Sequence, residues 1–205
     1  MDPISLLTRR GRWSRVATAL LIAGSVFAGP RFAEARGERI ANLNVEMKDG
    51  FVMVSAELIN GFSPETEEDI KNGVPKDLYF TILLKRRKPA WFDEETTSKT
   101  ILYRIKYDLL KKQYLVRRKA GGDFEETILD RYDAMRRLIS RIDNVKIASI
   151  ESLDKKATYT VSVKAEMKAT KIPLYLDYVL FFVPFQEVDT PWADSAPFYR
   201  LNGNR

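Results

Sequence analysis

The sequence predicts a mainly β or α+β fold, an antiparallel β-sandwich-like domain with one short and one longer helix. Runs of alternating apolar and polar residues indicate strands with one wet face. Asp49-Gly50 indicates a tight hairpin turn, and only two segments have a helical pattern. Strands joined mostly by short turns, with helices inserted between them, are typical of a sandwich or of a sheet with a helix on one face.

Residues 1–35 are predicted to be a cleavable signal peptide. Arginines come first, residues 16–28 are uncharged and mostly apolar, and small residues offer cleavage after Ala28 or after Ala35. The apolar stretch is shorter than the about 20 residues that a membrane span needs. We therefore expect a periplasmic or secreted protein, which would be membrane-anchored if the leader were retained.

Residues 36–205 are predicted to form a single strand-rich domain. The leader contains five of the 34 basic and two of the 28 acidic residues, which leaves 29 and 26 and a net charge of +3 instead of +6. This small excess gives little reason to expect nucleic acid as a partner. A chain of this length is long enough to bury a substantial core.

The chain contains no cysteine and no histidine. Their absence removes thiolate and Ser-His chemistry, the commonest general base at neutral pH and the commonest transition-metal ligand. An enzyme based on carboxylates or a Ca²⁺ site of oxygen ligands stays open. We predict no catalytic residue, no cofactor and no metal site, and thus a protein that is not an enzyme.

The first elements have well-defined boundaries. Leu43–Met47 and Val52–Leu58 alternate on either side of Asp49-Gly50 and are expected to form an antiparallel hairpin. Ser63-Pro64 is expected to open a short helix with an acidic first turn. Gly73 can adopt the left-handed conformation that ends it.

The middle of the chain predicts three strands and the longer helix. Leu78–Leu84 is apolar on both faces, which indicates a central strand covered on both sides. Ile101–Tyr107 alternates, Asp108–Lys112 turns the chain, and Tyr114–Arg118 returns as a strand. An apolar stripe at spacings of three and four predicts an amphipathic helix across about 130–142.

The last third is expected to return to strands. Asp143-Asn144 ends the helical pattern, Val145–Ile150 follows as a strand, and Tyr159–Met167 has the clearest alternation in the chain. Leu174–Val183 is expected to be the last strand. The aromatic tail 192–199 is expected to dock on the body of the domain, because so many exposed rings would be unfavourable.

The order of these features resembles a family of exported bacterial proteins, the domain of unknown function numbered 4390. The resemblance rests on short motifs: Asn72-Gly73-Val74-Pro75 after the acidic helix, a basic run before Trp91, Tyr107-Asp108, Tyr114-x-Val116, and Trp192 followed by Ser195 and Phe198. This sequence departs from the pattern at Lys88-Pro89-Ala90, where a second aromatic or a polar residue is expected before Trp91. The resemblance implies export and a single domain, and it brings no activity and no catalytic residues.

One basic and aromatic segment is the candidate interaction surface. It consists of Lys85, Arg86, Arg87, Lys88, Trp91 and Phe92. Such a segment could bind an acidic protein or lipid head groups. Adjacent basic residues at a strand end also have a simpler role, since they discourage pairing between sheets.

Three further groups have a structural interpretation that we prefer. Tyrosines could line a ligand groove with Trp91, but alternating tyrosines more often pack half-buried; they are Tyr103, Tyr107, Tyr114 and Tyr132. The cluster Glu65–Asp69 fits a helix N-terminus better than a Ca²⁺ loop. Asp93, Glu94 and Glu95 follow aromatic residues, an arrangement that suits glycoside hydrolysis. The sequence offers no second, separated carboxylate with a matching role, so a solvated loop is preferred.

The leading hypothesis is a non-catalytic exported domain that binds another envelope protein, with exposed strand edges suited to strand addition. The alternative is peripheral binding to an anionic membrane surface through residues 85–92. A third hypothesis is a carboxylate-based hydrolase of envelope glycans.

Overall fold

A computed structural model describes residues 37–89, 91–169 and 188–200. The chain divides into two units, Met1–Glu34 and Ala35–Arg205, and all described residues belong to the second. The predicted signal peptide and the predicted strand Leu174–Val183 lie outside the described residues.

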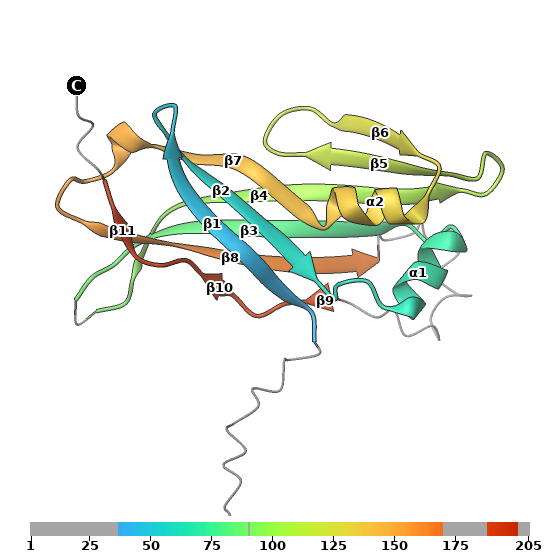
Figure 1. The fold of residues 1–205 in the computed structure, drawn as a ribbon, viewed down its shortest axis with the longest axis horizontal. Coiled ribbons are helices and arrows are strands. Elements are labelled where there is room, and N and C mark those ends of the chain that lie inside the picture. Colours follow the sequence, from blue (N-terminus) through green and yellow to red (C-terminus); the bar gives the residue numbers. More distant parts are fainter. Residues whose placement is uncertain (1–36, 90, 170–187, 201–205) are drawn as a thin grey trace, which may run out of the picture. The chain divides into compact units, whose positions relative to one another are not determined.

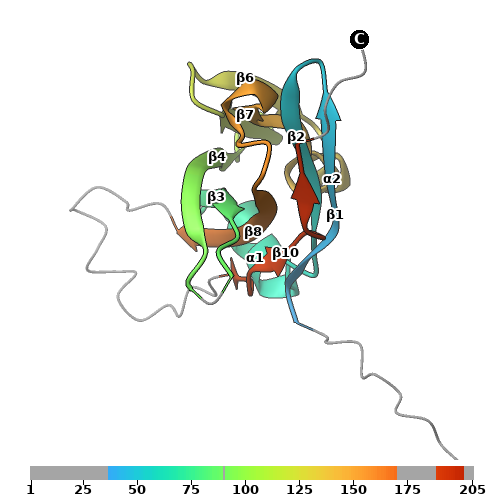
Figure 2. The same ribbon diagram turned by 90° about the vertical axis from the view of Figure 1, so that its left-hand side faces the viewer.

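Two antiparallel sheets form the body of this unit. The smaller sheet has the order β1-β2-β7, with strands Arg39–Lys48, Phe51–Ile59 and Arg141–Ser149. The larger sheet has the order β10-β8-β3-β4-β5-β6, in which β10 is the short strand Ala193–Asp194 of the tail. Its long strands are β3 (Lys76–Arg86), β4 (Glu94–Asp108), β5 (Gln113–Lys119), β6 (Glu125–Leu129) and β8 (Thr158–Ala169). The sheets lie as two layers (Figures 1 and 2) with one buried apolar cluster that includes residues of both.

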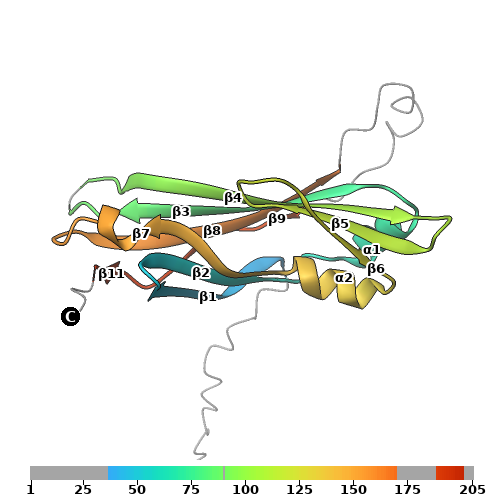
Figure 3. The same cartoon turned by 90° about the horizontal axis from the view of Figure 1, so that it is seen from above.

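Two helices and one short 3₁₀ turn complete the described part of the unit, and the predicted fold class is confirmed. Helices α1 (Pro64–Lys71) and α2 (Tyr132–Ile139) have eight residues each, and η1 spans Ile150–Ser152. No helix within the described ranges has the length and apolar character to cross a membrane. Figure 3 shows both helices at the same end of the sheets.

The second helix is shorter than predicted because its apolar stripe continues into a strand. The stripe residue Ile142 is buried, but it belongs to β7. The predicted break at Asp143-Asn144 lies inside that strand, where Asn144 has a φ of 49° and the pairing with β2 shifts register between Val54 and Ala56. A β-bulge, and not a helix end, is therefore what this polar pair produces.

The first hairpin forms as predicted. Lys48 pairs with Phe51, and the two residues between them both have positive φ, 52° for Asp49 and 77° for Gly50. This is the conformation of a type I′ turn, whose twist matches that of the strands it joins. The turn therefore fixes the register of β1 and β2.

Strand β3 lies in the centre of the larger sheet, between β8 and β4, as predicted. Its buried face is completely enclosed, with Leu78, Phe80, Ile82 and Leu84 at 0% exposure. The opposite face was expected to be equally covered, but Tyr79 and Leu83 are only half-buried. The strand has one core face because, among the described residues, the second sheet and both helices pack on that side.

The carboxy-terminal tail docks on the body, as predicted. Three short strands pair with β8: β9 (Val188–Asp189), β10 (Ala193–Asp194) and β11 (Phe198–Tyr199). The Phe198 ring packs against Tyr159 with 6.2 Å between ring centroids. The tail thereby covers the outer edge of β8.

Candidate functional site

The end of the β3–β4 pair brings three segments together. Beyond Arg86 the chain turns, and the Trp91 amide donates to the Lys88 carbonyl at 3.2 Å. Pro89, with its fixed φ, lies in this turn. The Arg87 amide donates to the Thr158 carbonyl at 2.8 Å, which joins the turn to the beginning of β8.

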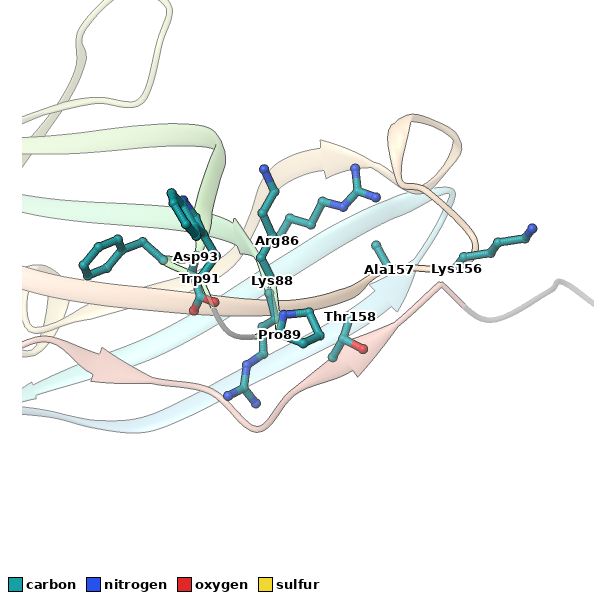
Figure 4. Close-up of a pocket in the computed structure, with 10 residues that line it drawn as sticks. Arg86, Lys88, Pro89, Trp91, Asp93, Lys156, Ala157 and Thr158 are labelled. Carbon is teal, nitrogen blue, oxygen red and sulfur yellow. The ribbon is translucent and has the colours of Figure 1, made fainter.

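These segments surround an open hollow of about 1120 Å³ (Figure 4). Its walls are Arg86, Arg87, Lys88, Pro89, Trp91, Phe92 and Asp93 on one side and Lys156, Ala157 and Thr158 on the other. Trp91 is 78% exposed and Phe92 is 89% exposed. Five of the six residues of the predicted interaction surface thus lie around one hollow, and we call this region the β3–β4 hollow.

Lys85, the sixth predicted residue, does not line the β3–β4 hollow. Its ammonium group lies 5.6 Å from the centre of the Trp192 ring, in cation–π geometry. Lys85 therefore contacts the tail. The other three residues of the basic run, Arg86, Arg87 and Lys88, line the hollow.

Ion pairs neutralise part of the positive charge around the hollow. Arg86 pairs with Asp154 at 2.9 Å, and Lys88 pairs with Glu94 at 2.7 Å. Within the described ranges, Arg87 and Lys156 form no ion pair. These two side chains are the cations that remain available to an acidic ligand.

The carboxylates at this end do not favour glycoside hydrolysis. The hydrogen bond from Lys88 and the charge of its ammonium group lower the pKa of Glu94. A general acid in a glycosidase needs a raised pKa. Asp154 is held by Arg86, so two of the nearby carboxylates act as ion-pair partners.

The tyrosines do not form a groove with Trp91. Tyr107, Tyr114 and Tyr132 pack on one another, with centroids 4.6 and 6.0 Å apart, at the turn between β4 and β5. Tyr103 is buried and its hydroxyl donates to the Arg141 carbonyl at 3.1 Å. Trp91 lies beyond Arg86, at the other end of the β3–β4 pair. These tyrosines therefore pack in the structure, as the sequence favoured, and do not line a ligand groove.

The acidic cluster at α1 serves the helix and its neighbours. The Ser63 hydroxyl accepts from the Thr66 amide as the N-cap. Glu67 pairs with Lys71 at 2.6 Å, and Asp69 pairs with the buried Lys76 at 2.6 Å. In the described part of the chain, no group of three or more acidic side chains converges on one point.

The strand edges are less open to strand addition than the sequence suggested. Strand β6 has five residues, and Glu125 and Glu126 form ion pairs with the arginines of β5. Two β7 carbonyls accept side-chain hydrogen bonds, that of Lys146 from Lys99 and that of Arg141 from Tyr103. Charges and side-chain caps of this kind protect edges. Strand β1 pairs only with β2 among the described strands, but a bulge between Ala41 and Asn44 and the exposed charges of Glu46 and Lys48 interrupt its free edge.

Sequence reasoning missed the far wall of the hollow. Lys156, Ala157 and Thr158 stand about seventy positions after the predicted surface in the sequence. No local pattern relates the two segments, because their proximity comes from the pairing of β8 with β3.

A family model described as a domain of unknown function (DUF4390) matches residues 35–195. A comparison with curated proteins found no match. A comparison with solved structures found none either.

Proposed function

Since this chain belongs to the DUF4390 family, which brings no activity with it, we propose that it is a non-catalytic exported domain that binds another envelope protein. The β3–β4 hollow is the binding surface. The observation that carries the proposal is the exposure of Trp91 and Phe92, at 78% and 89%, beside Arg87 and Lys156, which form no ion pair among the described residues. Exposed aromatic residues next to arginine are the composition of interaction hot spots.

The shape of the surface favours a protein over a membrane. Trp91 and Phe92 stand beside an open hollow of about 1120 Å³ that side chains of a partner protein can enter, whereas a bilayer would contact the two rings alone. Arg87 and Lys156 favour an acidic residue, and the two rings favour an apolar residue beside it. The expected ligand is therefore an acidic and apolar segment of a protein.

Export rests on the leader. The basic, apolar and small-residue regions of residues 1–35 follow the order of a secretion signal. The family match begins at residue 35, so this segment lies almost entirely outside the matched domain.

Site-specific photo-crosslinking in living cells tests the proposal. A photoreactive phenylalanine at position 92 is expected to form an adduct with one envelope protein. The same group at Ile128, an exposed residue on β6, is expected not to form it. Reversing an interface charge costs about 1–2 kcal/mol, or a factor of about 5–30 in binding. Arg87→Glu should therefore lower the adduct yield at least about fivefold.

Arg137→Glu is the matched control, because Arg137 is exposed on α2 and does not line the hollow. It should leave the adduct unchanged. Equal adducts from positions 92 and 128, or equal loss with both arginine variants, would contradict the proposal. Adducts with lipid in place of protein would establish the membrane alternative.

A further inference from the structure

The turn between β4 and β5 presents leucine to solvent. We call residues 108–112 the leucine tip. Leu110 is 96% exposed and Leu109 is 59% exposed. Turns favour glycine, asparagine, aspartate and serine, which satisfy backbone groups or tolerate positive φ, so the requirements of the turn do not explain a leucine as exposed as Leu110.

The leucine tip is held in one conformation. The amides of Leu110 and Lys111 both donate to the Asp108 carboxylate at 3.0 Å. Lys112 has a φ of 55° and completes the reversal. Leu109 contacts Gly73, where an added Cβ would lie 3.3 Å from its Cδ1 atom. The fixed turn therefore keeps Leu110 projecting outward.

Lysines surround the leucines. Lys106, Lys111 and Lys112 are exposed, and within the described ranges none of them forms an ion pair. The acidic residues of the adjacent helix α1 are partly neutralised, Glu67 by Lys71 and Asp69 by Lys76. With the Asp108 carboxylate counted, these lysines leave a net charge of +2 beside the convex apolar point.

From this combination we propose that the leucine tip inserts into the surface of an anionic lipid bilayer. A convex apolar side chain can enter the boundary between head groups and acyl chains, while the lysines remain among anionic head groups. A protein partner would need a matching pocket, whereas a bilayer accepts a single projecting leucine without one. The charge of the tip is complementary to anionic lipid.

The insertion would orient the domain. The leucine tip and the β3–β4 hollow lie at opposite ends of the paired strands β3 and β4, as Figure 1 shows. The 11 residues of β3 rise about 3.3 Å each, or about 35 Å in total. A domain inserted at its tip would hold the β3–β4 hollow about that far from the bilayer.

Fluorescent labelling tests the insertion, and the absence of cysteine from the chain makes single labelling sites simple to create. Full-length L110C and F92C variants carry an environment-sensitive fluorophore and are mixed with phosphatidylcholine vesicles, with or without phosphatidylglycerol. The label at position 110 is expected to shift to the blue only with the anionic vesicles, and the label at position 92 is expected not to respond. High salt should abolish the shift.

Replacement of the lysines tests the electrostatic part. Each lysine near an anionic surface contributes a factor of about five in binding, so K111Q/K112Q should weaken partitioning about 25-fold. K48Q, at the exposed end of β1, is the control and should leave it unchanged. No shift at position 110 with anionic vesicles, equal shifts at 92 and 110, or equal effects of the two sets of lysine changes would each overturn the proposal. The crosslinking test of the β3–β4 hollow is independent of these outcomes.

Discussion

At the scale of single residues, Tyr132 is the least satisfied group in the described part of the core. Its hydroxyl is buried without a hydrogen-bond partner among the described residues. Burial raises the pKa of Tyr132 to about 12, and the nearby Glu67 carboxylate adds to this shift. The folded state therefore favours the neutral phenol.

Tyr132→Phe is expected to raise the free energy of unfolding at neutral pH by up to about 1 kcal/mol, because it removes an unsatisfied polar group. Because the pKa of Tyr132 is about 12 in the folded state and 10 ordinarily, its ionisation does not change the free energy of unfolding below pH 10 and lowers that free energy as the pH rises from 10 towards 12. The variant should therefore also resist alkaline unfolding better. Urea titrations between neutral pH and pH 12 measure both effects.

Tyr103→Phe provides the matched control. The Tyr103 hydroxyl donates to the Arg141 carbonyl at 3.1 Å, so its removal should cost about 1 kcal/mol at neutral pH. Equal losses of stability in the two variants would contradict the assignment of an unsatisfied hydroxyl to Tyr132.

At the scale of elements, the end of α1 connects the helix to the leucine tip. The Gly73 and Val74 amides donate to the Ile70 and Asp69 carbonyls, both at 3.0 Å, in the pattern of a Schellman motif. Gly73 has a φ of +86°. Its missing side chain also leaves the space that Leu109 occupies.

Gly73→Ala is expected to lower the free energy of unfolding by about 1–2 kcal/mol, since alanine is strained at this φ and its Cβ would press on Leu109. Gly122→Ala is the control, because Gly122 has open space around it and no positive φ. It should change stability by less than about 0.5 kcal/mol. Chemical denaturation measures both, and equal effects would show that Gly73 imposes no constraint.

Elements that depend on local chemistry were predictable from the sequence. Asp49-Gly50 specifies a turn by its conformational preferences, and Ser63-Pro64 specifies a helix start by capping. Strand β6 was missed because its five residues are mostly exposed and show no buried alternation. Residues 141 and 142 were assigned to the wrong element because Ile142 faces the core in a strand as it would in a helix.

At the scale of the whole molecule, the sequence could predict a sandwich but not the assignment of strands to the two sheets. Strand β7 pairs with β2, and the next strand, β8, pairs with β3 in the other sheet. This exchange creates the far wall of the β3–β4 hollow. The local signals identified one side of the candidate site, and only the pairing of distant strands supplies Lys156 on the other.

The pairing of the tail with β8 closes one side of the larger sheet. The Ala165 amide donates to the Thr190 hydroxyl and the Val161 amide donates to the Ser195 hydroxyl, both at 3.0 Å. The Thr190 and Ser195 amides donate in return to the carbonyls of the same two residues. Without these contacts, the 12 residues of β8 would form an open edge.

We therefore expect Thr190→Val with Ser195→Ala to lower the free energy of unfolding by about 2–4 kcal/mol, because two amides of β8 lose their acceptors. The control is Thr100→Val with Ser98→Ala, since both residues are exposed on β4 and make no side-chain hydrogen bond among the described residues. It should change stability by less than about 1 kcal/mol.

Hydrogen exchange of the Val161 and Ala165 amides gives the specific readout. Faster exchange at these two positions, together with aggregation through the exposed edge, is the expected result. Unchanged protection at both amides would mean that the tail does not close the larger sheet.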